Sequence, residues 1–163
     1  MISERIHSLR HGRNSGFTLV ETTTVIAIVG ILAATALPRM SDLSGEARLA
    51  ALDNARAALS SVALRAHAKF LINGDTTQRF EDSTVTLVHG YPAATLATVE
   101  AAGLDSHYVI RTGAAGGAMT LVPKAIAGTP RANDCFLVYE QASASSPRPS
   151  IRIGANTTAQ TCV

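Results

Sequence analysis

The chain has 163 residues, enough for one modest globular domain and a small extra element. Apolar residues make up 47% and charged residues 16%, which excludes a wholly disordered chain, and a net charge of +2 excludes a protein built to coat nucleic acid. The excess positive charge comes from Arg5, Arg10 and Arg13, in front of the most apolar stretch of the chain. This order of charge and hydropathy is typical of a targeting leader.

The apolar stretch runs from residue 17 to residue 37 and contains one charged residue, Glu21. As a helix it would span about 31 Å, close to the hydrocarbon thickness of a bilayer. The sequence therefore predicts a single membrane-spanning helix, with the basic leader in the cytoplasm and the rest of the chain outside it. A secretory cleavage site at residues 33–36 is the alternative. The length of the stretch and the helical pattern beyond Pro38 favour cleavage before it, at Gly16.

Glu21 is the residue that calls for a partner, because a carboxylate in an apolar helix costs several kcal/mol unless it is paired or shielded. One interpretation places Glu21 at the membrane edge, where it snorkels toward water. The other supplies a cation from elsewhere: cleavage after Gly16 would free an α-amino group on Phe17. Within one subunit the carboxylate would suit the helix N-terminus. Between subunits, amine and carboxylate would pair in a low-dielectric core and set an axial register.

The sequence Gly16-Phe17-Thr18-Leu19-Val20-Glu21, followed by an apolar helix and Pro38, resembles the class III signal of type IV pilins and pseudopilins. The resemblance implies that a prepilin peptidase cuts after Gly16 and methylates Phe17. Glu21 then becomes the fifth residue, with a role in assembly, and Pro38 the twenty-second, with a helix kink. One departure is the run of threonines at residues 22–24, whose hydroxyls can bond to carbonyls three or four residues back.

The same resemblance implies a structural subunit rather than an enzyme, used for adhesion or motility. Its implied partners are the lipid bilayer before assembly, the prepilin peptidase, the pilus assembly machinery of the inner membrane, and copies of itself in a helical filament. The implied location is the bacterial inner membrane for a single-pass precursor with a cytoplasmic N-terminus, then an extracellular pilus. A looser resemblance to mannose-sensitive haemagglutinin (MSHA-type) pilins covers residues 47–63, AHAKFLINGD and HGYP.

Three alternatives remain at this point. A pseudopilin of a type II secretion system shares the leader and the helix. A minor or DNA-uptake pilin would carry ligand contacts on its head, with Arg148 and Arg152 as suspects and nucleic acid as a secondary partner. A membrane-anchored periplasmic enzyme is the third alternative, and the absence of a convergent catalytic set disfavours it.

Beyond Pro38 the helical pattern resumes, and apolar residues recur three or four apart up to Gly74, a natural stop. One helix is therefore predicted over residues 18–73. Its apolar stripe is Leu52, Ala55, Leu59, Val62, Ala66 and Phe70, while Asp53, Arg56, Ser60 and His67 fall largely on the other side.

Short strands are predicted over residues 84–89, 119–122, 135–139 and 150–153, and a short helix over 95–102. The predicted fold is α+β: a long helix, transmembrane in its first half, whose second half packs on a small antiparallel sheet. The predicted segments are a leader (1–16), a transmembrane and filament-core helix (17–38), an amphipathic half-helix (39–74) and a β-rich head (75–163).

The only two cysteines, Cys135 and Cys162, lie in the last 30 residues and are expected to form a disulfide outside the cytoplasm. No catalytic, metal or cofactor site is predicted. The histidines lack metal-ligand spacing, the glycines of residues 113–117 lack the lysine of a phosphate loop, and Asp105-Ser106-His107 is interpreted as a chance sequence rather than a triad.

Overall fold

The structure, a computed structural model, describes residues 17–81, 83–113 and 117–163. The chain divides into two compact units, Met1–Pro38 and Arg39–Val163. The predicted leader and its last residue, Gly16, lie outside the described residues, as does the middle of the predicted glycine-rich loop at residues 113–117.

Helix α1 (Leu19–Asn73) is the longest element and has ends that local chemistry explains. Thr18 caps its first turn, since its hydroxyl accepts a hydrogen bond from the Glu21 backbone N–H at 3.2 Å. The helix stops at Gly74, whose φ of +73° suits the left-handed turn that follows many helices. The prediction of one helix over residues 18–73 is confirmed, and the helical assignment continues through Pro38. The kink at Pro38 stays a prediction.

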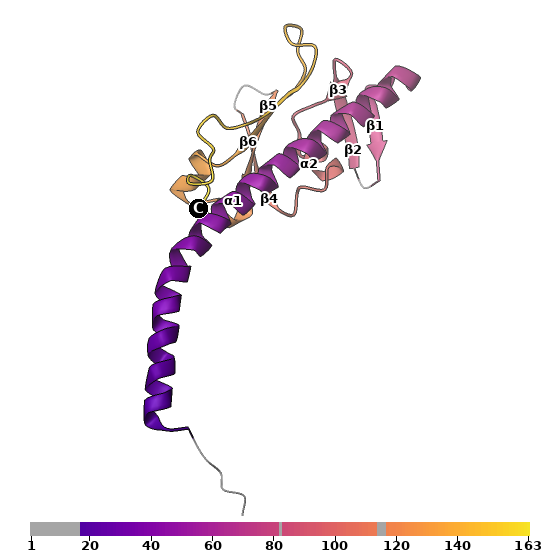
Figure 1. Ribbon diagram of the computed structural model, residues 1–163. Helices are drawn as coiled ribbons and strands as arrows, with labels where there is room; N and C mark the ends of the chain where they lie inside the picture. The colour runs from indigo at the N-terminus through magenta and orange to yellow at the C-terminus, as the bar shows by residue number, and fades with distance from the viewer. Residues whose placement is uncertain (1–16, 82, 114–116) are drawn as a thin grey trace, which may run out of the picture. The chain divides into compact units, whose positions relative to one another are not determined.

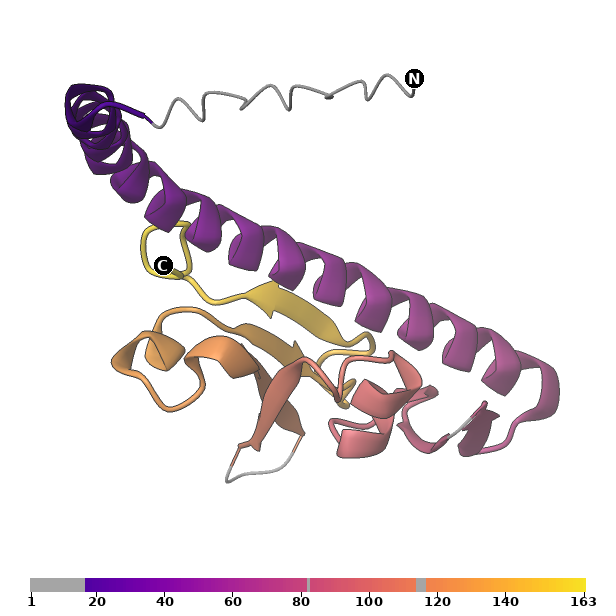
Figure 2. The ribbon, with the colours of Figure 1, turned by 90° about the horizontal axis from the view of Figure 1, so that it is seen from below.

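In the unit Arg39–Val163, the described strands form two antiparallel sheets. The first sheet has the order β1 (Thr77–Phe80), β2 (Ser83–Val88), β3 (Tyr91–Pro92). The second has the order β4 (Tyr108–Thr112), β5 (Ala118–Pro123), β6 (Leu137–Glu140), β7 (Ser150–Ile153). Helix α2 (Leu96–Ala101) joins the two sheets, and two 3₁₀ turns (Lys124–Ile126 and Pro130–Asn133) lie between β5 and β6. Figures 1 and 2 show the α1 segment of this unit lying across both sheets.

The core of this unit forms where the apolar stripe of α1 meets the sheets. Leu52, Ala55 and Leu59 pack with side chains of α2 and the four-stranded sheet, while Ala66 packs with β2 in a smaller cluster. The predicted stripe is confirmed over Leu52 to Ala66, all of it buried. His67 differs from the sequence expectation because it is half-buried, with its ring stacked on Tyr91.

The α+β arrangement is the predicted one, and it resembles a type IV pilin head. It differs from the prediction in having two small sheets rather than one, because α2 separates β3 from β4. Strands β1, β3 and β4 were not predicted. Strand β1 buries a polar residue, Gln78, and so lacks the alternation of apolar and polar residues that marks a half-buried strand.

The predicted strands at 84–89, 119–122 and 150–153 match β2, β5 and β7 to within a residue or two. The strand predicted over 135–139 begins later, at Leu137, because Cys135 turns toward the disulfide before the ladder with β5 starts. The predicted 95–102 helix is α2, with Thr95 and Ala102 at its two caps.

Candidate functional site

The first turn of α1 is a reciprocal cap built by Thr18 and Glu21. The Thr18 hydroxyl accepts from the Glu21 N–H, and Glu21 Oε2 accepts from both the Thr18 N–H and the Thr18 hydroxyl, each at 2.8 Å. This arrangement is a capping box, in which the first and fourth residues satisfy each other's backbone donors. Glu21 therefore has a local role at the helix N-terminus, as the sequence suggested, and the structure adds Thr18 as its partner. The spacing Thr-x-x-Glu is the usual signature of this capping box.

The second oxygen of the Glu21 carboxylate, Oε1, has different surroundings from Oε2. Glu21 Oε1 accepts no hydrogen bond from any residue in the described part of the chain. Phe17, just before the cap, is 91% exposed. The two residues that the sequence singles out for methylation and assembly thus lie at the same end of the helix, four residues apart.

The three threonines after Glu21 are satisfied within the helix. The Thr22 hydroxyl donates to the Thr18 carbonyl at 3.3 Å, while Thr23 and Thr24 both donate to the Val20 carbonyl, at 3.0 and 2.8 Å. The expectation that these hydroxyls bond three or four residues back is confirmed. Because their donors are paired, the threonines add little cost to an otherwise apolar helix surface.

The remainder of this helix segment presents apolar side chains on all sides. Among the described residues, one helical segment, Leu19–Leu37, is long and apolar enough to cross a membrane, with a mean hydropathy of 1.9. Its large side chains are exposed within the unit, for example Ile26 at 65% and Leu32 at 62%. A surface this apolar and this large requires a cover of lipid or protein.

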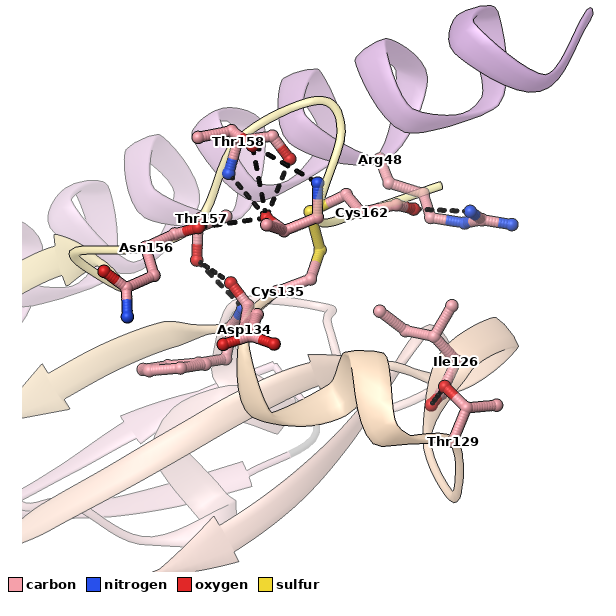
Figure 3. Close-up of a disulfide and its surroundings, with 11 residues drawn as sticks. Arg48, Ile126, Thr129, Asp134, Cys135, Asn156, Thr157, Thr158 and Cys162 are labelled. Atoms are coloured by element: carbon pink, nitrogen blue, oxygen red, sulfur yellow. Dashed lines mark hydrogen bonds between the residues drawn. A yellow bond between two sulfur atoms is a disulfide. The ribbon is translucent and has the colours of Figure 1, made fainter. Parts of the chain in front are cut away.

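The second predicted site is the disulfide. Cys135 and Cys162 are bonded and fully buried, and the bond joins the start of β6 to the end of the chain (Figure 3). The segment between β7 and Cys162 is held back on the sheet by Thr157, whose hydroxyl donates to the Asp134 carbonyl at 2.6 Å. The C-terminal segment is thereby fixed at its middle and at its end.

Two residues of α1 that the sequence analysis did not single out complete this attachment. The Arg48 guanidinium donates to the Cys162 carbonyl, as Figure 3 shows. Gly45 is buried beneath the C-terminal loop, where a Cβ would overlap the Ala159 carbonyl oxygen and lie 2.8 Å from Val163 Cγ2. Glycine inside a helix is unfavourable by about 1 kcal/mol relative to alanine, so its presence at residue 45 has a packing reason.

The two arginines named as candidate ligand contacts differ in their surroundings. Arg152 forms a bidentate pair with Glu140, with distances of 2.6 and 2.7 Å. This hydrogen-bonded guanidinium holds the pKa of the Glu140 carboxyl below its ordinary value. Arg148 forms no ion pair with any described residue. The structure thus leaves Arg148, not Arg152, available for a ligand.

Within the described residues, the histidines do not gather into a metal site. These residues hold no group of three or more His, Cys, Asp and Glu side chains that could bind a metal. His67 is fixed by Tyr91 and by the Gly90 carbonyl, 3.0 Å from its Nδ1. His7 and His11 belong to the predicted leader, outside the described residues.

Comparison with known proteins gives a match to a family model and a match to a curated relative. Residues 11–37 match the model of the prokaryotic N-terminal methylation motif. This segment carries a prepilin-type motif. The chain is also 49% identical over 49 residues to the type IV narrow pilus major component PilA5 of Thermus thermophilus. That alignment covers 30% of this chain and 42% of PilA5, so the chain spans less than half of its relative. No solved structure matches the chain.

The motif, the pilus relative and the fold agree with one another. Together they support a type IV pilin-like structural subunit. The MSHA-type resemblance and the processing reaction go beyond these matches.

Proposed function

We propose that the chain is the precursor of a type IV pilus subunit of the MSHA-like kind. A prepilin peptidase removes residues 1–16 by cutting after Gly16 and methylates the new N-terminus at Phe17. The precursor spans the inner membrane once, and the assembly machinery then extracts it into an extracellular filament used for adhesion or motility. The observation that carries this proposal is the methylation motif at residues 11–37, joined to an exposed apolar helix.

The assembly step follows from the surface of residues 17–38. In the membrane, lipid tails cover the exposed apolar side chains; in the filament, the same segments of other copies replace lipid. Gly30, Ala33, Ala34 and Ala36 are small and exposed, so they permit close approach between helices.

Glu21 guides docking by binding the α-amino group of Phe17 in a neighbouring copy. Its Oε2 stays in the capping box with Thr18, and Oε1 receives the amine. A pair of this kind gains strength in the low dielectric of a filament core, where neither ion is solvated. The capping box holds the carboxylate in one rotamer, which lowers the entropy lost when the amine binds.

Two substitutions separate the charge of Glu21 from its capping role. Glu21→Gln keeps an acceptor for the Thr18 N–H but removes the charge, whereas Thr18→Val removes the capping hydroxyl and keeps the charge. We expect Glu21→Gln to abolish most surface filaments while membrane insertion and processing continue, and Thr18→Val to retain filaments. The measurement is pilin in the sheared surface fraction relative to pilin in the membrane. Normal piliation by Glu21→Gln would refute the pairing.

Processing and location are tested by intact-mass analysis of material sheared from native cells. The expected species begins at methylated Phe17 and is lighter than its reduced form by two hydrogen atoms, because Cys135 and Cys162 are joined. The type II secretion pseudopilin is the second candidate, since it shares the same N-terminal motif. It is favoured if the processed species stays in the envelope. A chain that still begins at Met1 would contradict both.

A further inference from the structure

A groove of about 510 Å³ lies in the unit Arg39–Val163, and three separate segments line it. Arg56, Ser60 and His67 project from one stripe of α1, at spacings of four and seven residues. Tyr91 comes from β3, and Arg148 from the connection between β6 and β7. Tertiary folding brings these residues together, since they come from α1 and from two distant parts of the head.

The charge of this groove, which we call the Arg56–Arg148 groove, is one-sided. Two guanidinium groups line it, and none of its lining residues is acidic. Neither arginine forms an ion pair within the described part of the chain, in contrast to Arg152 nearby, which is held by Glu140. Two cations that share a groove repel each other, and an anion between them relieves the repulsion. Guanidinium groups also present paired donors that match carboxylate and phosphate oxygens.

The neutral groups of the groove fit hydroxyls rather than a bare ion. His67 Nδ1 lies 3.0 Å from the Gly90 carbonyl oxygen, which can only accept, so Nδ1 carries the proton and donates. The ring stacks on Tyr91 at a centroid distance of 4.1 Å and an interplanar angle of 5°, which fixes it in place. In the neutral ring, Nε2 is then an acceptor, and the Ser60 hydroxyl both donates and accepts.

Apolar side chains complete the wall of the groove: Ala63, Leu64, Pro149 and Ile151. A flat apolar wall suits the C–H face of a sugar ring, while the donors and acceptors suit its hydroxyls. A nucleic acid strand fits less well, because it requires a basic track that neutralises several phosphates. Basic and acidic side chains nearly balance over residues 39–163, and the groove offers two cations only.

We propose that the Arg56–Arg148 groove binds one acidic sugar residue, a hexose that carries a carboxylate or a phosphate. The arginines hold the anionic group, and Ser60 with His67 Nε2 bonds the ring hydroxyls. The proposal deepens the pilin proposal, on which it rests for its biological setting, because it names the class of surface ligand that the filament would meet. Binding itself requires only the folded subunit.

The test measures binding to the full chain in detergent micelles by isothermal titration calorimetry. The probes are glucuronic acid and glucose 6-phosphate, with glucose and inorganic phosphate as references. We expect saturable binding of at least one acidic sugar. Glucose and inorganic phosphate should each bind at least about tenfold more weakly. The acidic sugar that binds more tightly shows whether the groove prefers a carboxylate or a phosphate. Equal binding of glucose or of inorganic phosphate would overturn the proposal, as would no saturable binding of either acidic sugar.

Matched variants assign the binding to this groove. Arg56→Gln and Arg148→Gln are each expected to weaken the acidic sugar at least about tenfold, since each removes a charged hydrogen-bond donor. Arg131→Gln changes another exposed arginine, on the second 3₁₀ turn, and is expected to leave affinity unchanged. Unaltered near-ultraviolet circular dichroism shows that the variants are folded. Equal effects of all three variants would refute the assignment.

One further outcome tests the class of ligand, and two others keep this proposal separate from the filament proposal. A short single-stranded DNA that binds more tightly than both acidic sugars, and weakens steeply with salt, would replace the sugar by a nucleic acid. Loss of filaments in Glu21→Gln cells together with no sugar binding would leave the pilin proposal intact and overturn only the ligand. Sugar binding by the parent chain, together with normal filaments in Glu21→Gln cells, would keep the sugar proposal and refute the pairing of Glu21 with Phe17.

Discussion

Gly45→Ala tests whether the C-terminal loop is held against α1 by close backbone approach. The new methyl group would overlap the Ala159 carbonyl oxygen and lie 2.8 Å from Val163 Cγ2. Because one of these atoms is backbone, a side-chain rotation cannot relieve the overlap, and the loop between Ala159 and Cys162 must move away from the helix. That movement also stretches the hydrogen bond from Arg48 to the Cys162 carbonyl.

The expected size of the effect combines three contributions. Overpacking of a tight site costs about 1 to 3 kcal/mol. A hydrogen bond from a charged donor contributes about 1.5 to 3 kcal/mol, and a loosened loop loses part of it. Alanine stabilises a helix by about 1 kcal/mol relative to glycine, and this gain partly offsets the overpacking and the weakened hydrogen bond. We therefore expect Gly45→Ala to lower the free energy of unfolding by about 2 to 3 kcal/mol.

The assay is urea unfolding of the full chain in micelles, followed by tyrosine circular dichroism. All three tyrosines lie at residues 91, 108 and 139 and there is no tryptophan, so the signal reports the head. At an m-value of about 1.5 kcal/mol/M, the midpoint should fall by about 1 to 2 M. Ala57→Gly is the matched control, because Ala57 is exposed on the same helix and reports the helix preference without the overlap.

The sign of the change at residue 45, compared with that at residue 57, shows whether the loop overlap is real. If helix preference alone decided both positions, Gly45→Ala would stabilise the chain and Ala57→Gly would destabilise it by about 1 kcal/mol. With the loop overlap dominant at Gly45, both variants are destabilised, Gly45→Ala more strongly. A Gly45→Ala protein as stable as the parent, beside a destabilised Ala57→Gly protein, would refute the proposed contact.

Tyr139→Phe removes a buried hydroxyl that donates to the Pro92 carbonyl at 2.6 Å and joins the two sheets, so a loss of about 1 to 3 kcal/mol is expected in the same unfolding assay. Tyr108→Phe should cost less, because its acceptor belongs to an exposed turn of α1; an equal loss would contradict this. Burial raises the pKa of Tyr139 far above its ordinary value of 10.0, so the unfolded chain releases this proton first and stability should fall as pH rises above 10.0. The Tyr139→Phe variant should show a shallower alkaline decline between pH 9 and 11 than the parent, and an identical decline would refute this linkage. Cys135→Ser opens a loop with a sequence separation of 27 residues and should cost about 3 to 4 kcal/mol, measured against the oxidised parent; a loss below about 1 kcal/mol would show that hydrogen bonds alone hold the C-terminal segment.

Much of the helix and of the N-terminal site was predictable from the sequence, because the relevant signals are local. Hydropathy over consecutive residues predicts the apolar segment, the three-and-four spacing predicts the stripe from Leu52 to Ala66, and Gly74 marks the helix end. The capping box was equally predictable, since Thr18 and Glu21 are three residues apart, in the spacing that marks this motif.

The head was less predictable, because side-chain partners that no hydropathy pattern reveals decide which residues are buried. Gln78 is buried in β1 because the Asn73 side chain and the Asp75 carbonyl accept from its amide, at 2.9 and 2.8 Å. Without knowledge of those partners, a polar residue in so short a segment favours the prediction of a loop over that of a strand. In the same way, only the pairing of β6 with β7 shows that Glu140 engages Arg152.

The sequence by itself determined the basic N-terminal segment, the apolar segment with its single carboxylate and the span of α1, since each depends on residues near one another in the chain. It also determined which cysteines pair, because the chain has two. The tertiary structure decided why residue 45 is glycine, how Arg48 holds the end of the chain, and that Arg56 and Arg148 share a groove. These features depend on how strands and loops dock on α1. Docking is set by the packing of the whole core, which no local pattern encodes.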